Sequence, residues 1–435
     1  MSTFHIWTLG CQMNQADSLK LAAGLERLGY HAVEDDLEAD LVVINTCSVR
    51  QHAEDRAYGR LHTLRQRREA GAQFQIAVMG CMVGPKTDDL QRRFPFVDVW
   101  ARPQEFDPIL AKAGVVRDAS EGEFWTETFA TPTGPTAYIP VVHGCDKFCT
   151  YCIVPLRRGR ERSRPIVDVL AEVRHLAEHG VREVTLLGQT VEAYGHDLGG
   201  ADAGADLATL FEGIERIDGI ARTRFLTSYP KDMTDRIIDA VADLPKVCEH
   251  FNIPVQSGDD AVLARMRRGY SVAEYEERVA RIRSRMPDVA LATDVIVGSP
   301  GETDEEFRNT VGLLERTGFD VIHVAAYSPR PGTFAYRNQP DDVPTEVKRE
   351  RLQVIEALHA ASAGRINARL VGRSVEVLVE REQEGRLTGR IRGGQLVHFD
   401  GYRNLVGNLV DVSVTEATPW SLQGQQAGAL SFSVV

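Results

Sequence analysis

The feature that most constrains this chain is a set of three cysteines within eight residues, Cys145, Cys149 and Cys152. Three residues and then two separate the successive thiols, so all three sulfurs can reach one compact inorganic centre. Thiolates of this kind hold iron–sulfur clusters, whereas a structural zinc site normally takes four ligands in paired spacings. His143 lies just upstream, but no fourth Cys or His follows at a short interval. The spacing predicts an iron–sulfur site, with incidental or zinc-binding cysteines as the alternative.

Three thiolates leave one iron of a 4Fe-4S cluster without a protein ligand, which implies that a substrate or cofactor binds there. The motif that contains Cys145, Cys149 and Cys152 resembles that of the radical S-adenosylmethionine superfamily. In that superfamily the open iron chelates the amino and carboxylate groups of S-adenosylmethionine. The reduced cluster then cleaves this cofactor into methionine and a 5′-deoxyadenosyl radical, so the cofactor carries the difficult chemistry.

A second group of cysteines has a different regularity, because each member follows a short apolar run. Cys11, Cys47 and Cys81 come after the runs 4–9, 41–44 and 76–79. We interpret these runs as buried strands, separated by helices over 17–28 and 52–68, in a β-α-β-α-β order. Such strands are normally parallel, and their carboxyl ends meet at the edge where open α/β sheets bind ligands.

Convergence at that edge makes Cys11, Cys47 and Cys81 candidate ligands of a second three-thiolate cluster. The alternative is that they are small buried hydrophobic residues, as free cysteines often are. Cys248 fits neither trio and is interpreted as structural.

The middle of the chain predicts a partial barrel of parallel strands. Six short apolar runs alternate with helical stretches, at 138–142, 184–187, 224–226, 251–255, 290–297 and 321–326. Catalytic groups of β/α barrels lie at the carboxyl ends of the strands, and the cysteine motif follows the first run. Polar residues in or after the later strands are candidates for holding the cofactor, or else ordinary structural polar groups: Gln189, Ser228, Gln256 and Asp294.

The C-terminal segment predicts a small β-barrel. After a helical stretch over 347–358, short runs occur at 375–379, 387–391, 396–399 and 409–414, with turn residues between them. Small antiparallel strands of this number suggest a barrel of the oligonucleotide-binding kind, and the segment resembles the TRAM domain, an RNA-binding module. Arg386, Arg390 and Arg392 are candidate phosphate contacts. A solvated strand face balanced by Glu380, Glu382 and Glu384 is the alternative.

A second basic stretch, 157–164, follows the cysteine motif directly and contains five Arg and one Glu. Guanidinium groups match phosphate oxygens, so Arg157, Arg158 and Arg160 are candidates for gripping an RNA backbone beside the radical site. A charged loop that caps the barrel is the alternative.

Charge and hydropathy exclude other classes of protein. The 50 basic and 62 acidic residues give a net charge of −12, which argues against a nucleic-acid coat that acts through bulk positive potential. No apolar run approaches the roughly 18 residues that span a bilayer. The first residues lack the pattern of an export signal, so we expect a cytoplasmic protein with no membrane partner.

The expected architecture is α/β with three domains. These are an open parallel α/β sheet domain (1–130), a partial (β/α)6 radical core (135–365) and a small antiparallel β-barrel of the TRAM, OB-like type (368–435). A Pro- and Gly-containing linker is expected over 131–136.

Together these motifs resemble the methylthiotransferase family of radical enzymes, and most closely its MiaB-type branch. The segments that carry this resemblance are 10–14, 45–50, 145–155 and 254–258. The resemblance implies methylthiolation of C2 of N6-isopentenyladenosine, next to the anticodon of tRNA. It also implies two 4Fe-4S clusters, with Cys145, Cys149 and Cys152 holding the radical cluster and Cys11, Cys47 and Cys81 an auxiliary cluster. S-adenosylmethionine would be both radical source and methyl donor.

The implied partners are the anticodon stem-loop of tRNA, an electron donor such as flavodoxin or ferredoxin, and a sulfur donor. Single-stranded loops expose their bases for this kind of recognition. Two alternatives remain within the family, the modification of threonylcarbamoyladenosine in tRNA and that of a ribosomal-protein aspartate. A third alternative is a non-catalytic RNA-binding iron–sulfur protein.

Overall fold

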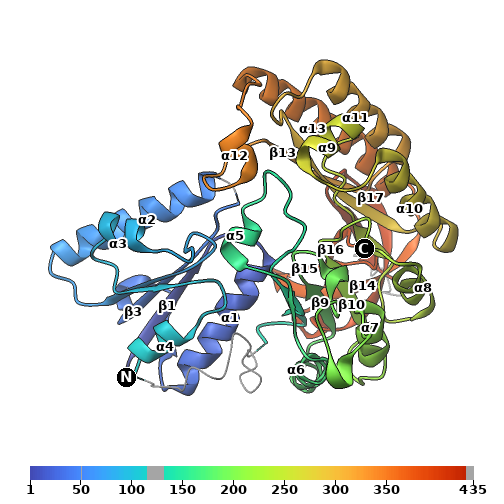
Figure 1. Cartoon of the computed structure of the whole chain (residues 1–435). Coiled ribbons are helices and arrows are strands. Elements are labelled where there is room, and N and C mark those ends of the chain that lie inside the picture. The colour runs from blue at the N-terminus through green and yellow to red at the C-terminus, as the bar shows by residue number, and fades with distance from the viewer. Residues whose placement is uncertain (50, 115–131, 428–435) are drawn as a thin grey trace.

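The computed structural model describes residues 1–49, 51–114 and 132–427. Thr131, where the predicted linker begins, lies outside these residues, as do Arg50 and the last eight residues of the third expected domain. Among the described helices, none is both long and apolar enough to cross a membrane. The described chain forms a parallel α/β sheet, an open parallel barrel and a closed β-barrel (Figure 1).

The first sheet has five parallel strands in the order β2-β1-β3-β4-β5. Its strands are β1 (Thr3–Thr8), β2 (His31–Ala32), β3 (Leu41–Thr46), β4 (Gln75–Gly80) and β5 (Val99–Ala101). Every residue of β3 is buried because helices cover both faces of the sheet. These helices are α1 (Gln12–Arg27), α2 (Gln51–Glu69), α3 (Asp88–Arg93) and α4 (Asp107–Lys112). The predicted α/β order is confirmed, and α1 begins five residues earlier than expected, directly after Cys11.

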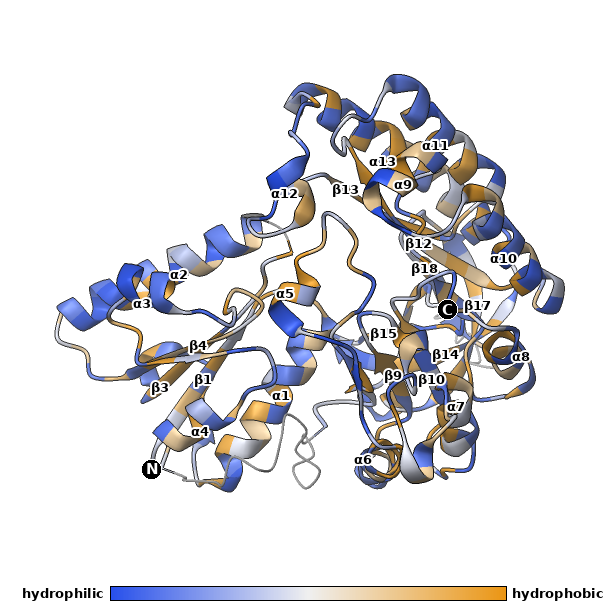
Figure 2. Cartoon of the chain, in the orientation of Figure 1, coloured by the Kyte–Doolittle hydropathy of each residue, from blue (hydrophilic) through white to orange (hydrophobic). Residues whose placement is uncertain are grey.

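The central region contains all six predicted strands, in two three-stranded parallel sheets. The first sheet is β6 (Thr136–Pro140), β9 (Glu183–Leu187) and β10 (Arg222–Leu226), and the second is β11 (His250–Asn252), β12 (Ala290–Val297) and β13 (Val321–Ala326). An isolated parallel bridge joins Thr223 of β10 to Val247, in the segment that precedes β11. Figure 2 shows these strands mostly in apolar colours, and the outer sides of the surrounding helices in polar colours.

The helices around the barrel alternate with its strands. The longer ones are α6 (Ile166–Glu178), α7 (Leu207–Glu215), α8 (Asp235–Asp243), α10 (Val272–Arg285), α11 (Asp304–Thr317) and α13 (Thr345–Ala368). Shorter elements are α5 (Val154–Arg158), α9 (Asp260–Met266), α12 (Phe334–Asn338) and the two-stranded ribbon of β7 (Val142–His143) and β8 (Arg162–Ser163).

The C-terminal barrel is closed, with strand order β14-β15-β16-β18-β17. Its strands are β14 (Ser374–Gln383), β15 (Arg386–Arg390), β16 (Leu396–Asp400), β17 (Leu409–Ala417) and β18 (Leu422–Gln426). The sequence predicted four of them. The fifth, β18, pairs antiparallel with β17 but parallel with β16, so the barrel is not purely antiparallel. The sequence of β18, Leu-Gln-Gly-Gln-Gln, has no apolar pattern, so the strand was not predicted. Leu422 is nevertheless fully buried in the barrel core.

Two interfaces hold the three parts together. The closed barrel lies at the amino ends of β10 and β11, where Arg222 donates to the carbonyl of Arg390 (2.7 Å) and Arg224 to the carbonyl of Arg392 (2.6 Å). The N-terminal sheet contacts the central barrel through α1, where Lys20 pairs with Glu172 of α6 at 3.5 Å. The closed barrel does not cover the carboxyl ends of the strands in the N-terminal sheet or in the central barrel.

Candidate functional site

Cys11, Cys47 and Cys81 follow β1, β3 and β4 at one edge of the N-terminal sheet. Burial raises the pKa of the Cys47 thiol to about 11, and the neighbouring thiols of Cys81 and Cys11 add to this shift. Gly10 permits this close approach. It has a φ of +113°, and a Cβ there would come within 2.7 Å of the Cys47 Cβ. The three thiols are therefore mutual neighbours, as the parallel order predicts.

Cys145, Cys149 and Cys152 lie in a loop that the β7–β8 ribbon closes at its base. The Cys145 amide donates to the Gly159 carbonyl at 3.1 Å. Burial raises the pKa of Cys152 to about 12, with Cys149 and Cys145 contributing. Gly144 has a φ of +72°, and a Cβ there would lie 2.0 Å from the Arg160 carbonyl oxygen. A glycine precedes the first cysteine of each trio, and at both positions a side chain would collide.

One buried arginine contacts each trio. Arg158, at the end of α5, donates to the Cys81 Sγ through its Nε at 3.4 Å. Arg268, after α9, donates to the Cys149 Sγ through its Nη1 at 3.3 Å. Both guanidinium groups are buried, and each lies beside a thiol that must ionise to bind metal. Sequence reasoning missed Arg268 entirely, since it lies 119 residues from its cysteine.

Arg158 also joins the two parts of the chain that carry the trios. Its Nη2 donates to the Asn14 Oδ1 at 2.8 Å and to the Asp17 carboxylate at 3.1 Å, and both partners lie on α1. Its remaining nitrogen, Nη1, is buried without a hydrogen-bond partner. In Figure 1, α5 lies between the N-terminal sheet and the barrel.

The donor set fits iron–sulfur clusters better than single ions. Among the residues that the structure describes, no three Cys, His, Asp or Glu side chains are grouped to hold one metal ion. A cuboidal cluster instead offers its ligands separate corners. Each trio supplies three thiols and a buried guanidinium, and the unpartnered Nη1 of Arg158 is suited to a sulfur or sulfide acceptor.

A cavity of about 220 Å³ opens beside Cys152, in the trio of the central barrel. Cys152, Gln256 and Asp294 line it, together with Val49 from the N-terminal part and Arg330. Gln256 has a φ of +71°, and its Oε1 is buried without a partner. Positive φ is strained for a side chain of this kind and is often retained at functional sites. The structure therefore places two of the four predicted cofactor residues around one cavity.

The other two predicted cofactor residues, Gln189 and Ser228, do not line this cavity. Gln189 follows β9, and its Oε1 is buried without a partner. Ser228 lies after β10 and is buried beside Glu192. Their role in cofactor binding remains a prediction.

Glu192 is a buried acid that the sequence gave no reason to select. One carboxyl oxygen accepts a hydrogen bond from the Tyr229 amide at 3.1 Å. Burial raises its pKa from 4.5 to about 8, so the neutral carboxyl is favoured in the folded protein. Below pH 4.5 the group is neutral in both folded and unfolded chains, and its contribution to stability is fully present.

Between pH 4.5 and about 8 only the unfolded chain ionises at this position. We therefore expect stability to fall with rising pH in this window, by up to about 1.4 kcal/mol per unit from this one group. Glu192→Gln should remove that slope. Urea unfolding of the metal-free protein at several pH values, compared between wild type and variant, measures it, and parallel profiles would contradict the expectation.

The Arg-rich stretch is not uniformly available to RNA. Arg158 is fully buried in the contacts described above, which corrects the prediction that it binds RNA. Arg157 is half-buried against Gly84 of the N-terminal part. Arg160 is exposed and forms a bidentate pair with Asp146 at 2.5 and 2.8 Å. Arg157 and Arg160 remain candidate RNA contacts.

The candidate arginines of the closed barrel are also paired. Arg392 donates to both carboxylate oxygens of Glu249 at 2.8 and 3.0 Å, so it joins the barrel to the core. An RNA contact of Arg392 stays a prediction. Arg390 pairs with Glu380, as the alternative interpretation of this face proposed. Arg386 lies 3.6 Å from Asp400 and is half-exposed.

Family models match three segments of the chain. The "Radical SAM superfamily" model matches residues 139–314, the "Uncharacterized protein family UPF0004" model residues 3–102, and the "TRAM domain" model residues 368–426.

Curated relatives match over nearly the full chain. A tRNA-2-methylthio-N(6)-dimethylallyladenosine synthase of Dehalococcoides mccartyi (strain CBDB1) is 44% identical over 99% of this chain and 100% of its own. One of Chloroflexus aurantiacus is 43% identical over 97% of this chain and 91% of its own.

Among solved structures, the radical S-adenosylmethionine methyltransferase TsrM from Kitasatospora setae, with cobalamin and a [4Fe-4S] cluster bound, shares the fold. Its TM-score is 0.56 at 16% identity, covering 77% of this chain and 74% of that one. The cobalamin-dependent radical enzyme OxsB has a TM-score of 0.54 at 14% identity, covering 82% and 56%.

Proposed function

The chain belongs to the family of tRNA-2-methylthio-N(6)-dimethylallyladenosine synthases, and on that premise we propose how its two cysteine trios divide the reaction. The protein is a radical S-adenosylmethionine enzyme that methylthiolates dimethylallyladenosine in tRNA with the help of an iron–sulfur cluster. The finer proposal is that Cys145, Cys149 and Cys152 hold the radical cluster, and that Cys11, Cys47 and Cys81 hold a second, auxiliary cluster.

One observation supports this division most directly: each trio has its own buried arginine, and Arg158 reaches from the loop of one trio to a thiol of the other. When bound, the radical cluster with S-adenosylmethionine supplies the radical that removes hydrogen from C2, and the auxiliary cluster supplies the site that holds the sulfur. The inert C–H bond is the reason for radical chemistry.

The protein's own residues position and enclose these groups. Arg268 orders the radical loop, since it also donates to the Tyr270 hydroxyl at 2.9 Å and to the Pro254 carbonyl at 3.1 Å. Gln256 and Asp294 are proposed to hold the cofactor in the 220 Å³ cavity, where Gln256 offers its unpartnered oxygen. Apolar walls from Ile153 and Val295 limit the access of water to this cavity.

The proposal includes two further partners. Reductive cleavage of the cofactor needs an electron donor, for which a flavodoxin or ferredoxin is proposed, and each product molecule needs one sulfur atom from a donor. The tRNA substrate would present its anticodon loop at the carboxyl ends of the barrel strands, because β/α barrels carry their chemistry there.

The nucleoside composition of tRNA tests the function. In cells that lack this protein, we expect dimethylallyladenosine to persist without its methylthio group, because the proposed reaction forms the C–S bond at C2. Mass spectrometry of digested tRNA measures both nucleosides. A plasmid that encodes the wild type or Cys248→Ala, which alters a buried cysteine outside both trios, should restore the product. An unchanged tRNA profile with loss of a modified ribosomal-protein aspartate would contradict the proposal.

A further inference from the structure

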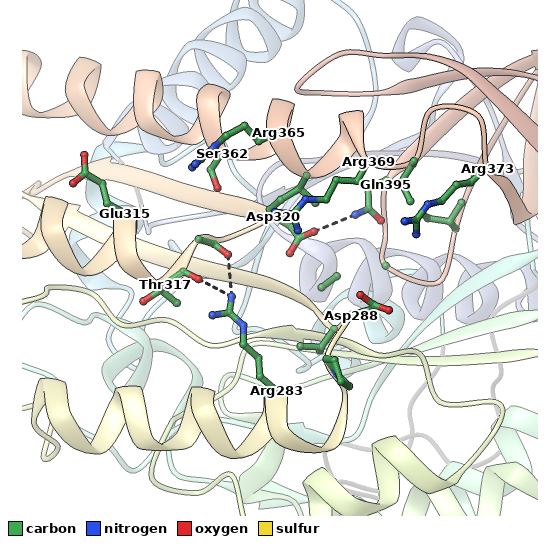
Figure 3. A pocket seen from close by; sticks show the side chains of 18 residues that line it. Arg283, Asp288, Glu315, Thr317, Asp320, Ser362, Arg365, Arg369, Arg373 and Gln395 are labelled. Atoms are coloured by element: carbon green, nitrogen blue, oxygen red, sulfur yellow. Dashed lines mark hydrogen bonds between the residues drawn. The ribbon is translucent and has the colours of Figure 1, made fainter.

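A pocket of about 650 Å³ lies between the central and closed barrels, and no cysteine lines it. Its walls come from the ends of α10, α11 and α13, from the residues that precede β12 and β13, and from the β15–β16 turn (Figure 3). The pocket is thus at the amino ends of the parallel strands, whereas Cys152 and Gln256 lie at the carboxyl ends.

Four arginines line this pocket. Arg283 donates to the carbonyls of Thr317 and Gly318 at 2.6 and 3.1 Å, and it also interacts electrostatically with Asp320. Arg365 lies in the last turn of α13, Arg369 is the residue that caps this helix, and Arg373 directly precedes β14; all three line the pocket. Within the described part of the chain, these three side chains have no hydrogen bond or ion pair.

Arg365, Arg369 and Arg373 form no hydrogen bond or ion pair with described residues through their side chains, unlike several of the arginines that the sequence predicted to bind RNA. Arg390 and Arg392 are paired with carboxylates, and Arg158 is buried. In a chain of net charge −12, a phosphate is expected to bind where positive charge exceeds negative charge locally. Four arginines against three acids line this pocket, and Asp320 offsets part of the charge of Arg369.

Three acids also line the pocket and limit which ligand it suits. Both carboxylate oxygens of Asp320 already accept hydrogen bonds, one from the Leu291 amide at 2.8 Å and the other from the Gln395 side chain at 3.2 Å. Asp288 and Glu315 are exposed at the rim. In Figure 3, Glu315 lies at the opposite end of the view from Arg373. Arg373 therefore lies at the end of the pocket away from Glu315, whereas Asp320 lies beside Arg369.

Gln395 adds a requirement for a donor group. Its Oε1 is buried without a partner, beside the arginines. A ligand that satisfies both features carries phosphate oxygens as acceptors and a hydroxyl as donor. Ribose phosphate has both, because the 2′-hydroxyl donates and the phosphate accepts.

We propose that this pocket binds the ribose–phosphate backbone of tRNA, as a contact separate from the site of chemistry; this inference rests on the proposed function. Ala290, the first residue of β12, lines this pocket, and Asp294, four residues further along the strand, lines the cavity beside Cys152. The two sites are therefore separated by at least about 13 Å along the barrel, which a single nucleoside does not span but a stretch of tRNA backbone does.

Combined replacement of Arg365, Arg369 and Arg373 by alanine tests the proposal in the full-length, cluster-loaded protein. Three lost phosphate contacts should make the slope of log Kobs against log salt less negative by about 2 to 3. Affinity for whole tRNA at about 0.1 M salt should fall more than tenfold. Filter binding across a salt series measures both quantities. Arg349→Ala is the matched control, since Arg349 is exposed on α13, outside the pocket.

The outcomes separate this inference from the proposed function. A triple variant with the wild-type slope, or an equal change in Arg349→Ala, would overturn the pocket assignment. Tight binding of AMP, measured by equilibrium dialysis and lost in the triple variant while the tRNA slope is unchanged, would also overturn it, in favour of a free nucleotide. Release of 5′-deoxyadenosine without tRNA should be unaffected, so its loss in the wild type would count against the proposed function alone.

Discussion

Replacement of Cys145, Cys149 and Cys152 by alanine should halve the iron content of the reconstituted protein, from about eight atoms per chain to about four. The reason is that Cys11, Cys47 and Cys81, with Arg158 beside Cys81, remain intact. Release of 5′-deoxyadenosine under anaerobic reduction should be abolished, because no site for its formation remains. Iron and sulfide assays with chromatography of the adenosine product measure these effects.

Cys248→Ala provides the control for this experiment. Cys248 is fully buried and lies near Arg224, away from both trios, so its replacement should leave iron and product unchanged. A wild-type protein that holds only one cluster at full occupancy would contradict the proposed division. So would a triple variant that still cleaves S-adenosylmethionine.

Arg158→Ala should lower the free energy of unfolding of the metal-free protein by about 3–5 kcal/mol. The substitution leaves the Asp17 carboxylate buried without its partner, and it removes the donor to Asn14. Arg158→Lys should recover part of the loss, since it keeps the charge but not the fork geometry. Urea unfolding measures the change.

Arg160→Ala is the matched control, two residues away. Arg160 is 74% exposed in its pair with Asp146, and pairs of this kind contribute about 0–1 kcal/mol. If Arg158→Ala lowered the free energy of unfolding by no more than Arg160→Ala does, the buried contacts of Arg158 would not be holding the two parts of the chain together.

Local patterns were enough to predict most of the fold. The runs that became β3 and β12 are apolar almost throughout, and such runs form buried parallel strands. Because parallel strands end at one edge, the meeting of Cys11, Cys47 and Cys81 followed from their positions after three strands. The cysteine motif of the central barrel was recognised from the spacing of its cysteines alone.

The sequence did not reveal contacts between distant segments. Arg158 and Arg392 stand in basic stretches that resemble RNA-binding surfaces, yet Asp17 and Glu249, 141 and 143 residues away, pair with them. Arg365 and Arg373 gave no signal, since a helix end with arginines is common. That helix end lines a pocket only because the closed barrel lies beside it.

The exposure of Cys11 gives the auxiliary site a direction of approach. Cys47 and Cys81 are buried, while Cys11 begins α1 at the surface. Under the proposed division of the trios, a sulfur donor would approach the auxiliary cluster from this side, and dissolved oxygen would use the same opening. The opening that would allow replenishment would therefore also be the point at which air begins to degrade that cluster.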